Sequence, residues 1–243
     1  MGVTAFLIKI FGRKIMFYKK IFVLMLFIAS MMIFVVGCSN ETAAKSFETQ
    51  KIREGLNLFN SADYKCAISL LDEISTLKLN TTAEYNLRGE YLVKIGEYYY
   101  DTMNYDKGKE LFDLAIRDYD SAIKLAPNNV DAYIGRGNAY ANTGHLVQRD
   151  LNKAIELNPN DFRAYMARSI IYLNVGQNNL ALEDANKAVE LNPDNPAVYN
   201  NRGLVYHNLK QYDSALQDYS ESILTRIFLS SSIKDTSRRG YTK

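Results

Sequence analysis

The stretch Asn152–Pro159, NKAIELNP, returns almost unchanged as NKAVELNP at Asn186–Pro193, and a shorter version, SAIKLAP, occupies Ser121–Pro127. The three prolines are separated by 32 and 34 residues. A repeat of this length is typical of a chain built from stacked structural units, each of which buries its apolar face against its neighbours. The sequence therefore predicts a chain of repeated structural units.

A second phrase precedes each of these stretches. It reads YIGRGNAY at 133–140, YMARSIIY at 165–172 and YNNRGLVY at 199–206. The two phrases together resemble the tetratricopeptide repeat (TPR), a 34-residue pair of antiparallel helices, A and B. The resemblance implies small residues where A and B approach closely, aromatic residues between successive repeats, and a proline that ends helix B.

The repeats match this pattern to different degrees. In 196–229, Ser222 replaces the last Ala of helix B, and 130–161 is two residues short, with Val147 in place of an early Ala. We expect Asn or Asp beside each proline to cap the next helix. The repeat at 162–195 has the most complete set of family positions, which are Tyr165, Ser169, Tyr172, Ala181, Ala185, Ala188 and Pro193.

The resemblance implies an all-α fold, a right-handed α-solenoid of about five helical hairpins that covers residues 47–229. Gly55 and Ala67 have the same spacing as Gly203 and Ala215, which places a first repeat before the clear ones. The expected repeats are 47–80, 82–129, 130–161, 162–195 and 196–229.

The end of the chain departs from the pattern. Residues 230–243 match no repeat and are expected to form an irregular tail. The Asn-Pro that would follow Leu224 is missing. A truncated or frameshifted reading frame, a stabilising partner or a self-association surface would each account for this end.

The repeat at 82–129 is longer than the others. Gly89 and Ala115 are 26 residues apart, an excess of 14 over the usual spacing. Seven extra residues in each helix, about 10 Å, would keep an antiparallel pair in register. We expect long helices at 82–103 and 106–126 and a projecting tip. A disordered loop is the alternative, which the aromatic sequence EYYYDTMNYD disfavours. The tip would carry Tyr98, Tyr99, Tyr100 and Tyr105.

The N-terminus reads as a targeting segment. Lys19 and Lys20 precede the uncharged run Ile21–Val36, which is about 24 Å long as a helix and short for a permanent span of about 30 Å. Val35–Cys38 resembles a lipobox. The resemblance implies cleavage between Gly37 and Cys38 and lipidation of Cys38, which makes 1–37 a signal peptide and 38–46 a polar tether. An uncleaved signal anchor is the alternative.

Two further features concern the start and the destination of the chain. Met16 opens a compact signal, so translation from Met16 rather than Met1 is a hypothesis. Ser39 stands where lipoproteins of the inner membrane often have Asp. We therefore expect a lipid-anchored, extracytoplasmic protein of the bacterial cell membrane or outer membrane, periplasmic if an outer membrane exists.

Composition argues against several function classes. Residues 1–37 hold five of the 29 basic residues and no acid, so the rest of the chain has 24 basic and 27 acidic residues. It lacks a basic stripe, and we expect no nucleic-acid partner. Two His and two Cys give no metal cluster, and no nucleophile or phosphate-binding motif appears. We expect no enzyme activity, cofactor, metal or small-molecule substrate. The acids of helix B, such as Asp184 and Asp218, read as a solvated face.

In the TPR family, helix A lines a concave groove, and Asn side chains there can both donate to and accept from a peptide backbone. Ordinary solvated helix residues are the alternative interpretation. The candidate groove residues are Asn138, Asn142, Arg163, Asn174, Asn200, His207 and Asn208. Asn138 matches the Asn of the carboxylate-clamp members, but Ile134 replaces their Lys.

The sequence thus predicts a membrane-anchored scaffold of the bacterial envelope that binds a protein or peptide partner in this groove. The alternative is a signal-anchored TPR protein with its repeats on the cytoplasmic side.

Overall fold

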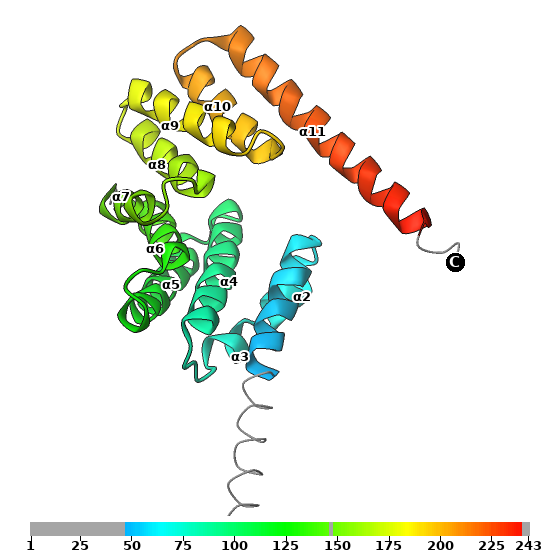
Figure 1. The fold of residues 1–243 in the computed structure, drawn as a ribbon. Helices are drawn as coiled ribbons and strands as arrows, with labels where there is room; N and C mark the ends of the chain where they lie inside the picture. Colours follow the sequence, from blue (N-terminus) through cyan, green and yellow to red (C-terminus); the bar gives the residue numbers. More distant parts are fainter. Residues whose placement is uncertain (1–46, 146–147, 240–243) are drawn as a thin grey trace, which may run out of the picture. The chain divides into compact units, whose positions relative to one another are not determined.

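The computed structural model describes residues 47–145 and 148–239, with side chains up to residue 228 (Figure 1). The chain divides into two units, Met1–Lys51 and Ile52–Lys243. In the first unit, residues 47–51 are helical, and the Lys51 ammonium lies 5.2 Å from the centroid of the Phe47 ring. The predicted signal peptide with Gly37, the predicted lipidation site Cys38, the predicted tether and Val147 lie outside the described residues.

The second unit is a series of helical hairpins, and its described residues contain only helices and connecting turns. The prediction of an all-α TPR-type solenoid is confirmed. The first hairpin consists of a helix that ends at residue 60, followed by α2 (Tyr64–Ser69) and α3 (Leu71–Ser75). The second pairs α4 (Thr82–Asp101) with α5 (Tyr105–Leu125), and the third pairs α6 (Val130–Asn142) with α7 (Gln148–Leu157). The last two pair α8 (Phe162–Asn174) with α9 (Asn178–Leu191) and α10 (Pro196–Asn208) with α11 (Tyr212–Arg239).

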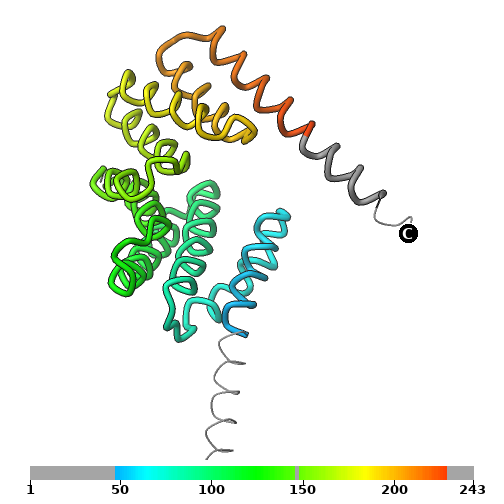
Figure 2. Tube along the Cα trace, viewed as in Figure 1, coloured from blue at the N-terminus to red at the C-terminus, as the bar shows by residue number. Residues whose placement is uncertain are grey.

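From α4 onwards the helices form two layers. Each helix packs against the helices before and after it in the chain, as the trace in Figure 2 shows. The A helices also contact one another, α4 with α6, α6 with α8, and α8 with α10. The A helices therefore make a layer of their own, and this layer positions the candidate binding residues.

The proline-containing turns set where the helices begin. Helices α5, α7 and α9 end two residues before Pro127, Pro159 and Pro193, because proline cannot continue the hydrogen-bond ladder. Two residues after each proline, a polar side chain accepts a backbone N–H of the next helix. These N-cap residues are Asn129, Asp161 and Asn195.

Within a hairpin, the turn between helix A and helix B uses one residue of left-handed conformation. Gly144 and Gly176 have φ of 79° and 73°, which glycine adopts without a steric penalty. Met103 and Lys210 take the same position with φ of 64° and 60°. Their Cβ atoms make this conformation less favourable.

Small residues in helix A let the aromatic rings of helix B approach its backbone. A Cβ on Gly203 would stand 2.7 Å from the Tyr219 ring, and one on Gly89 would stand 2.7 Å from the Tyr119 ring. The close approach that the TPR resemblance implied is thus present in the second and the last hairpin.

The long hairpin, α4 and α5, ends within two residues of the limits that the sequence predicts. Its tip does not project freely, however, because Tyr98 stacks on Tyr64 of the first hairpin with ring centroids 5.0 Å apart. Tyr100 packs on Tyr105 and Phe112, and Tyr99 is half-buried against the core. Only Tyr105 of the four tip tyrosines is strongly exposed.

The end of the chain differs from the expected irregular tail at 230–243. Helix α11 continues to Arg239, ten residues into that segment (Figure 1). The sequence between Tyr212 and Arg239 contains no proline or glycine, so no residue in it interrupts the helical hydrogen bonds.

Candidate protein-binding groove

A repeated ion pair fixes helix A against helix B in the last four hairpins. Arg168 of α8 donates from Nε and Nη2 to the two carboxylate oxygens of Asp184 on α9, at 2.7 and 2.8 Å. Arg88–Asp118, Arg136–Asp150 and Arg202–Asp218 form the same two-pronged pair. Such pairs define the relative position of two helices closely, because both donors are fixed in one plane.

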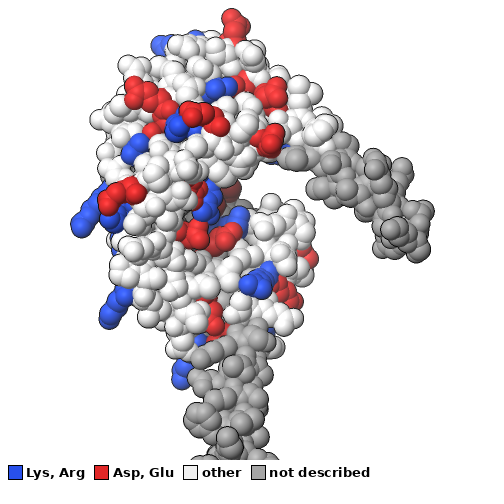
Figure 3. Space-filling model, viewed as in Figure 1, with Lys and Arg blue, Asp and Glu red and all other residues white. Residues whose placement is uncertain are grey.

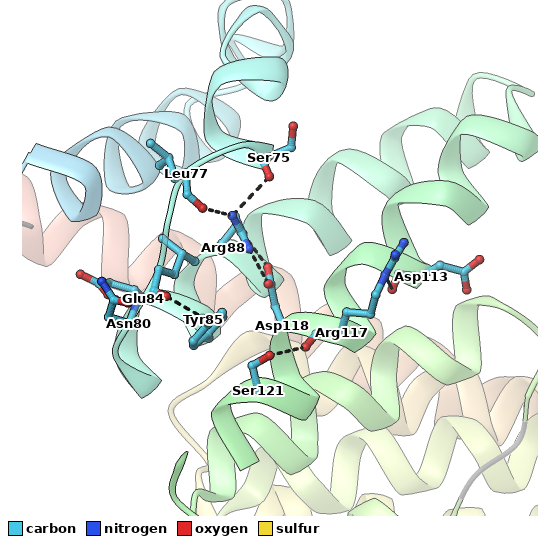
Figure 4. A network of polar contacts seen from close by, with 11 residues as sticks. Ser75, Leu77, Asn80, Glu84, Tyr85, Arg88, Asp113, Arg117, Asp118 and Ser121 are labelled. Atoms are coloured by element: carbon cyan, nitrogen blue, oxygen red, sulfur yellow. Dashed lines mark hydrogen bonds and ion pairs between the residues drawn. The ribbon is translucent and has the colours of Figure 1, made fainter. Parts of the chain in front are cut away.

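The same arginines connect successive hairpins. Nη1 of Arg136 donates to Asp120 of α5, Nη1 of Arg168 to Asn152 of α7, and Nη1 of Arg202 to Asn186 of α9. In the long hairpin, Nη1 of Arg88 donates instead to the backbone carbonyl oxygens of Ser75 and Leu77 (Figure 4). Each arginine thus joins three successive segments of the chain.

These pairs correct the interpretation of the helix B acids as a solvated face. Asp184 and Asp218 are 6% and 4% exposed and neutralise arginines. Arg136, Arg168 and Arg202 also lie against tyrosine rings of their own helices, with the Arg168 guanidinium carbon 5.7 Å from the centroids of both Tyr165 and Tyr172. Stacking of this kind stabilises a guanidinium.

The layer of A helices carries a groove of about 990 Å³. Its apolar floor includes Ile134 of α6 and Met166 and Ile170 of α8. Charged residues of both signs stand among the lining residues. They are Arg53, Glu90, Lys94, Glu97, Asp131 and Arg163.

Models of known protein families match three segments of the chain between residues 105 and 217. Residues 151–183 and 185–217 match a model described as tetratricopeptide repeat, and residues 105–144 match one described as TPR repeat.

Residues 105–144, 151–183 and 185–217 thus contain tetratricopeptide repeats.

A solved structure agrees with this at the level of the fold. The chain resembles TTC0263, a thermophilic TPR protein of Thermus thermophilus, with a TM-score of 0.59 and 17% identity over 76% of this chain and 98% of that chain. The likeness to MamA is looser, with a TM-score of 0.45 and 22% identity over 73% of this chain and 96% of that chain. No curated protein sequence matches the chain significantly.

The TPR groove contains only part of the candidate set from the sequence. Asn138 and Arg163 line it. Asn142 does not, but its Nδ2 donates to Glu97, a lining residue, at 3.1 Å. The remaining candidates are exposed and lie outside the lining residues, and they are Asn174, Asn200, His207 and Asn208.

Sequence reasoning missed the contribution of the long helix α4. Asn86, Glu90, Lys94 and Glu97 recur every three or four residues along it and line the TPR groove. The signal was available, since α4 is the A helix of its hairpin and this spacing places the residues on one face. The sequence-based prediction covers inward positions only in the three later repeats.

Two acids of the groove region have altered pKa values. Protein atoms surround the carboxyl group of Glu97 and raise its pKa, although part of the side chain meets solvent. The hydrogen bond from Asn142 and the charge of Lys94 oppose this increase. Burial also disfavours the ionised form of Asp161, the N-cap of α8, but the hydrogen bonds and charge of Arg163 outweigh burial and lower its pKa.

Arg163 is less available than the sequence suggested. Its Nη2 donates to both Asp131 and Asp161 at 2.6 Å. A ligand carboxylate would have to displace these acids to bind Arg163 closely. The arginine therefore orders the rim of the groove more than it offers a free positive charge.

Within residues 47–145 and 148–239, no group of His, Cys, Asp and Glu is arranged to hold a metal ion. The same residues include no helix with the length and apolar character needed to cross a bilayer. Side chains of both charges are interspersed on the face in Figure 3, so that face has no patch of one sign. TPR proteins are generally non-enzymatic scaffolds, and the fold suggests interaction with other proteins.

Proposed function

We propose that this chain is a membrane-anchored scaffold of the bacterial cell envelope that holds a protein or peptide partner in its TPR groove. The groove carries the proposal: most of its lining residues come from α4, α6, α8 and the start of α10, so a bound segment would contact several repeats at once. Burial of apolar ligand atoms against the apolar lining residues would contribute affinity, and the polar lining residues would fix the orientation of the ligand.

The lining residues indicate the chemistry of the partner. Ile134, Met166 and Ile170 suit an apolar side chain of the ligand. Glu90 and Glu97 offer acceptors, and the amide of Asn138 can pair with a peptide group. A segment that combines apolar and basic residues fits this lining better than a strongly acidic one, because Arg163 is already neutralised by Asp131 and Asp161.

Cross-linking at single positions tests the groove. A photoreactive residue in place of Met166 should give a covalent adduct with the partner in cells. The matched control is the same residue in place of Glu183, which is exposed on helix α9 and does not line the groove. Adducts from Glu183 and none from Met166 would move the binding site out of the groove.

The anchor is a separate part of the proposal, and it rests on the sequence Val35–Cys38 at the end of an apolar run. The intact mass of protein extracted from membranes tests it, with Cys38→Ala as the control. We expect the mass of residues 38–243 plus acyl chains, and loss of the acyl mass in the variant. An unprocessed, unacylated chain would favour the signal anchor instead.

A further inference from the structure

One residue of a B helix reaches the TPR groove. Among the residues that the structure describes, Tyr119 of α5 is the only B-helix residue that lines it. The Tyr119 ring lies against glycines of two A helices. A Cβ on Gly89 of α4 would stand 2.7 Å from Tyr119 Cζ, and one on Gly135 of α6 would stand 2.6 Å from the hydroxyl oxygen. The two glycines therefore leave the space through which the hydroxyl reaches the groove.

The later hairpins lack this feature. Counted from the paired Arg and Asp, the equivalent residues are Leu151 and Ala167 between α7 and α8, and Ala185 and Asn201 between α9 and α10. Leu151 and Ala185 are fully buried, and neither lines the groove. The hydroxyl of Tyr119 is thus a property of one interface in this chain and not of the repeat in general.

This hydroxyl has no hydrogen-bond partner among the described residues, although Tyr119 is only 4% exposed. The hydroxyl of Tyr91, which is fully buried, instead donates to the backbone oxygen of Ala67 at 2.6 Å. The Tyr119 oxygen is not one of the fully enclosed polar atoms of the described part, so it meets the groove. A ligand that fills the groove must therefore replace the hydrogen bond that water makes there.

The charges around the hydroxyl indicate which ligand group fits. Burial raises the pKa of Tyr119 most, and the negative charges of four acids raise it further. In decreasing order of effect, these acids are Glu90, Asp118, Glu97 and Asp131. Asp118 belongs to the Arg–Asp pair of its hairpin, whereas Glu90 is exposed. The surroundings therefore repel a ligand carboxylate and attract a cationic donor.

The positive residues of the groove leave the charge of Glu90 unpaired. Nζ of Lys94 lies 5.7 Å from the centroid of the Phe59 ring in the first hairpin, and Arg53 belongs to the same helix as Phe59. Arg163 is bonded to two other acids. Within the described part of the chain, Glu90 forms no ion pair. Its carboxylate can therefore accept from a ligand cation.

We propose that the TPR groove binds a lysine side chain of its partner, with the ammonium held by the Tyr119 hydroxyl oxygen and the Glu90 carboxylate. This inference rests on the function proposed above. An ammonium has three N–H donors and no acceptor, which suits a site rich in acceptors. Val93 of α4 and Ile134 of α6 line the groove next to these acceptors and would pack on the alkyl chain of the lysine.

Peptide binding to the full chain in a mild detergent tests the lysine site. The probes are Ala-Leu-Xaa-Leu-Ala peptides, capped at both ends, whose central residue is lysine or norleucine, which lacks the ammonium. We expect the lysine peptide to bind at least about tenfold more tightly. Tyr119→Phe should reduce this preference by about threefold or more and leave thermal stability unchanged, because the hydroxyl has no protein partner to lose. The matched control is Tyr219→Phe, since Tyr219 packs on Gly203 in the last hairpin and does not line the groove.

A second variant removes the charge alone. Glu90→Gln should reduce the lysine preference by about tenfold, and Glu183→Gln, on the exposed side of α9, should not change it. Equal affinity for the two peptides overturns the proposal, as does a preference that survives both Tyr119→Phe and Glu90→Gln, or a lysine peptide that does not bind. Cross-linking from Met166 reports on the groove separately. Adducts from Met166 together with equal peptide affinities would refute the lysine site and leave the scaffold function standing.

Discussion

Arg88 and Asp118 are separated by 30 residues in the chain, yet they form the same two-pronged ion pair as Arg168 and Asp184, which are separated by 16. The donor–acceptor distances are 2.7 Å for both prongs of Arg88. The 14 additional residues therefore leave the relation between helix A and helix B unchanged at this point, because they are shared between α4 and α5. The same Arg–Asp pair joins helix A to helix B in every hairpin from α4 onwards.

Removal of one member of such a pair should destabilise the solenoid strongly. Asp184→Ala leaves the Arg168 guanidinium partly buried without its carboxylate, which should cost about 2–3 kcal/mol and lower the midpoint of thermal unfolding by about 4–10 °C. The control Glu183→Ala changes the neighbouring exposed acid and should shift the midpoint by less than about 2 °C. Equal shifts in the two variants would show that the pair is not a main source of stability.

Acid should weaken the solenoid through Asp161. Its folded pKa is lowered, so the stability it contributes is complete above the unfolded pKa of about 3.9 and is lost as the pH falls through that value towards the folded pKa. Asp161→Asn keeps a capping side chain on α8 but removes the charge. Thermal midpoints of both proteins between about pH 7 and pH 3 should converge at low pH. A constant difference would contradict this assignment.

The turn between α10 and α11 should tolerate glycine better than lysine. Lys210 has φ of 60°, and Lys210→Gly should raise the free energy of unfolding by about 0.5–1 kcal/mol, because glycine adopts this conformation without steric cost. Gly176→Ala, in the equivalent turn between α8 and α9, should lower it by about 1 kcal/mol. Chemical unfolding followed by circular dichroism measures both changes, and an unstable Lys210→Gly protein would refute the steric account.

Substitution of Asn138, but not of Asn174 or Asn200, should weaken partner binding. Asn138 lines it and Asn174 and Asn200 do not. Asn138→Ala should weaken partner binding by about 1 kcal/mol, roughly fivefold, through the loss of one or two hydrogen bonds. Asn174→Ala and Asn200→Ala should have no effect, as measured by titration calorimetry with the partner segment recovered by cross-linking. An effect of Asn200→Ala equal to that of Asn138→Ala would place the ligand along α10 instead.

The limits of the hairpins could be predicted because local residues determine them. Pro127, Pro159 and Pro193 end the B helices, and the spacing of Gly89 and Ala115 accounts for the length of α4 and α5. The prediction of an irregular end was wrong, since the absence of a repeat motif does not imply the absence of a helix. A sequence free of proline and glycine remains helical without matching any repeat.

The ion pairs and the groove were harder to predict because they depend on residues far apart in the chain. Asp184 beside Glu183 looks like a surface acid in the pattern of α9 alone, and only its pairing with Arg168 sixteen residues earlier shows otherwise. The groove depends in addition on which A helices the fold brings side by side. Ile134 lines the groove, whereas Asn200, which takes the same position in the last hairpin, does not.

The equal sharing of the 14 residues also determines what further changes of length this architecture allows. Seven residues make almost two full turns, so they change the direction of a side chain beyond them by only about 20°. A single residue inserted into α4 alone, beyond Arg88, would rotate the rest of α4 by about 100° about its axis. The side chains of α4 beyond Arg88 would then no longer face α5 as they do now. The hairpin can therefore lengthen only if α4 and α5 both gain the same whole number of helical turns.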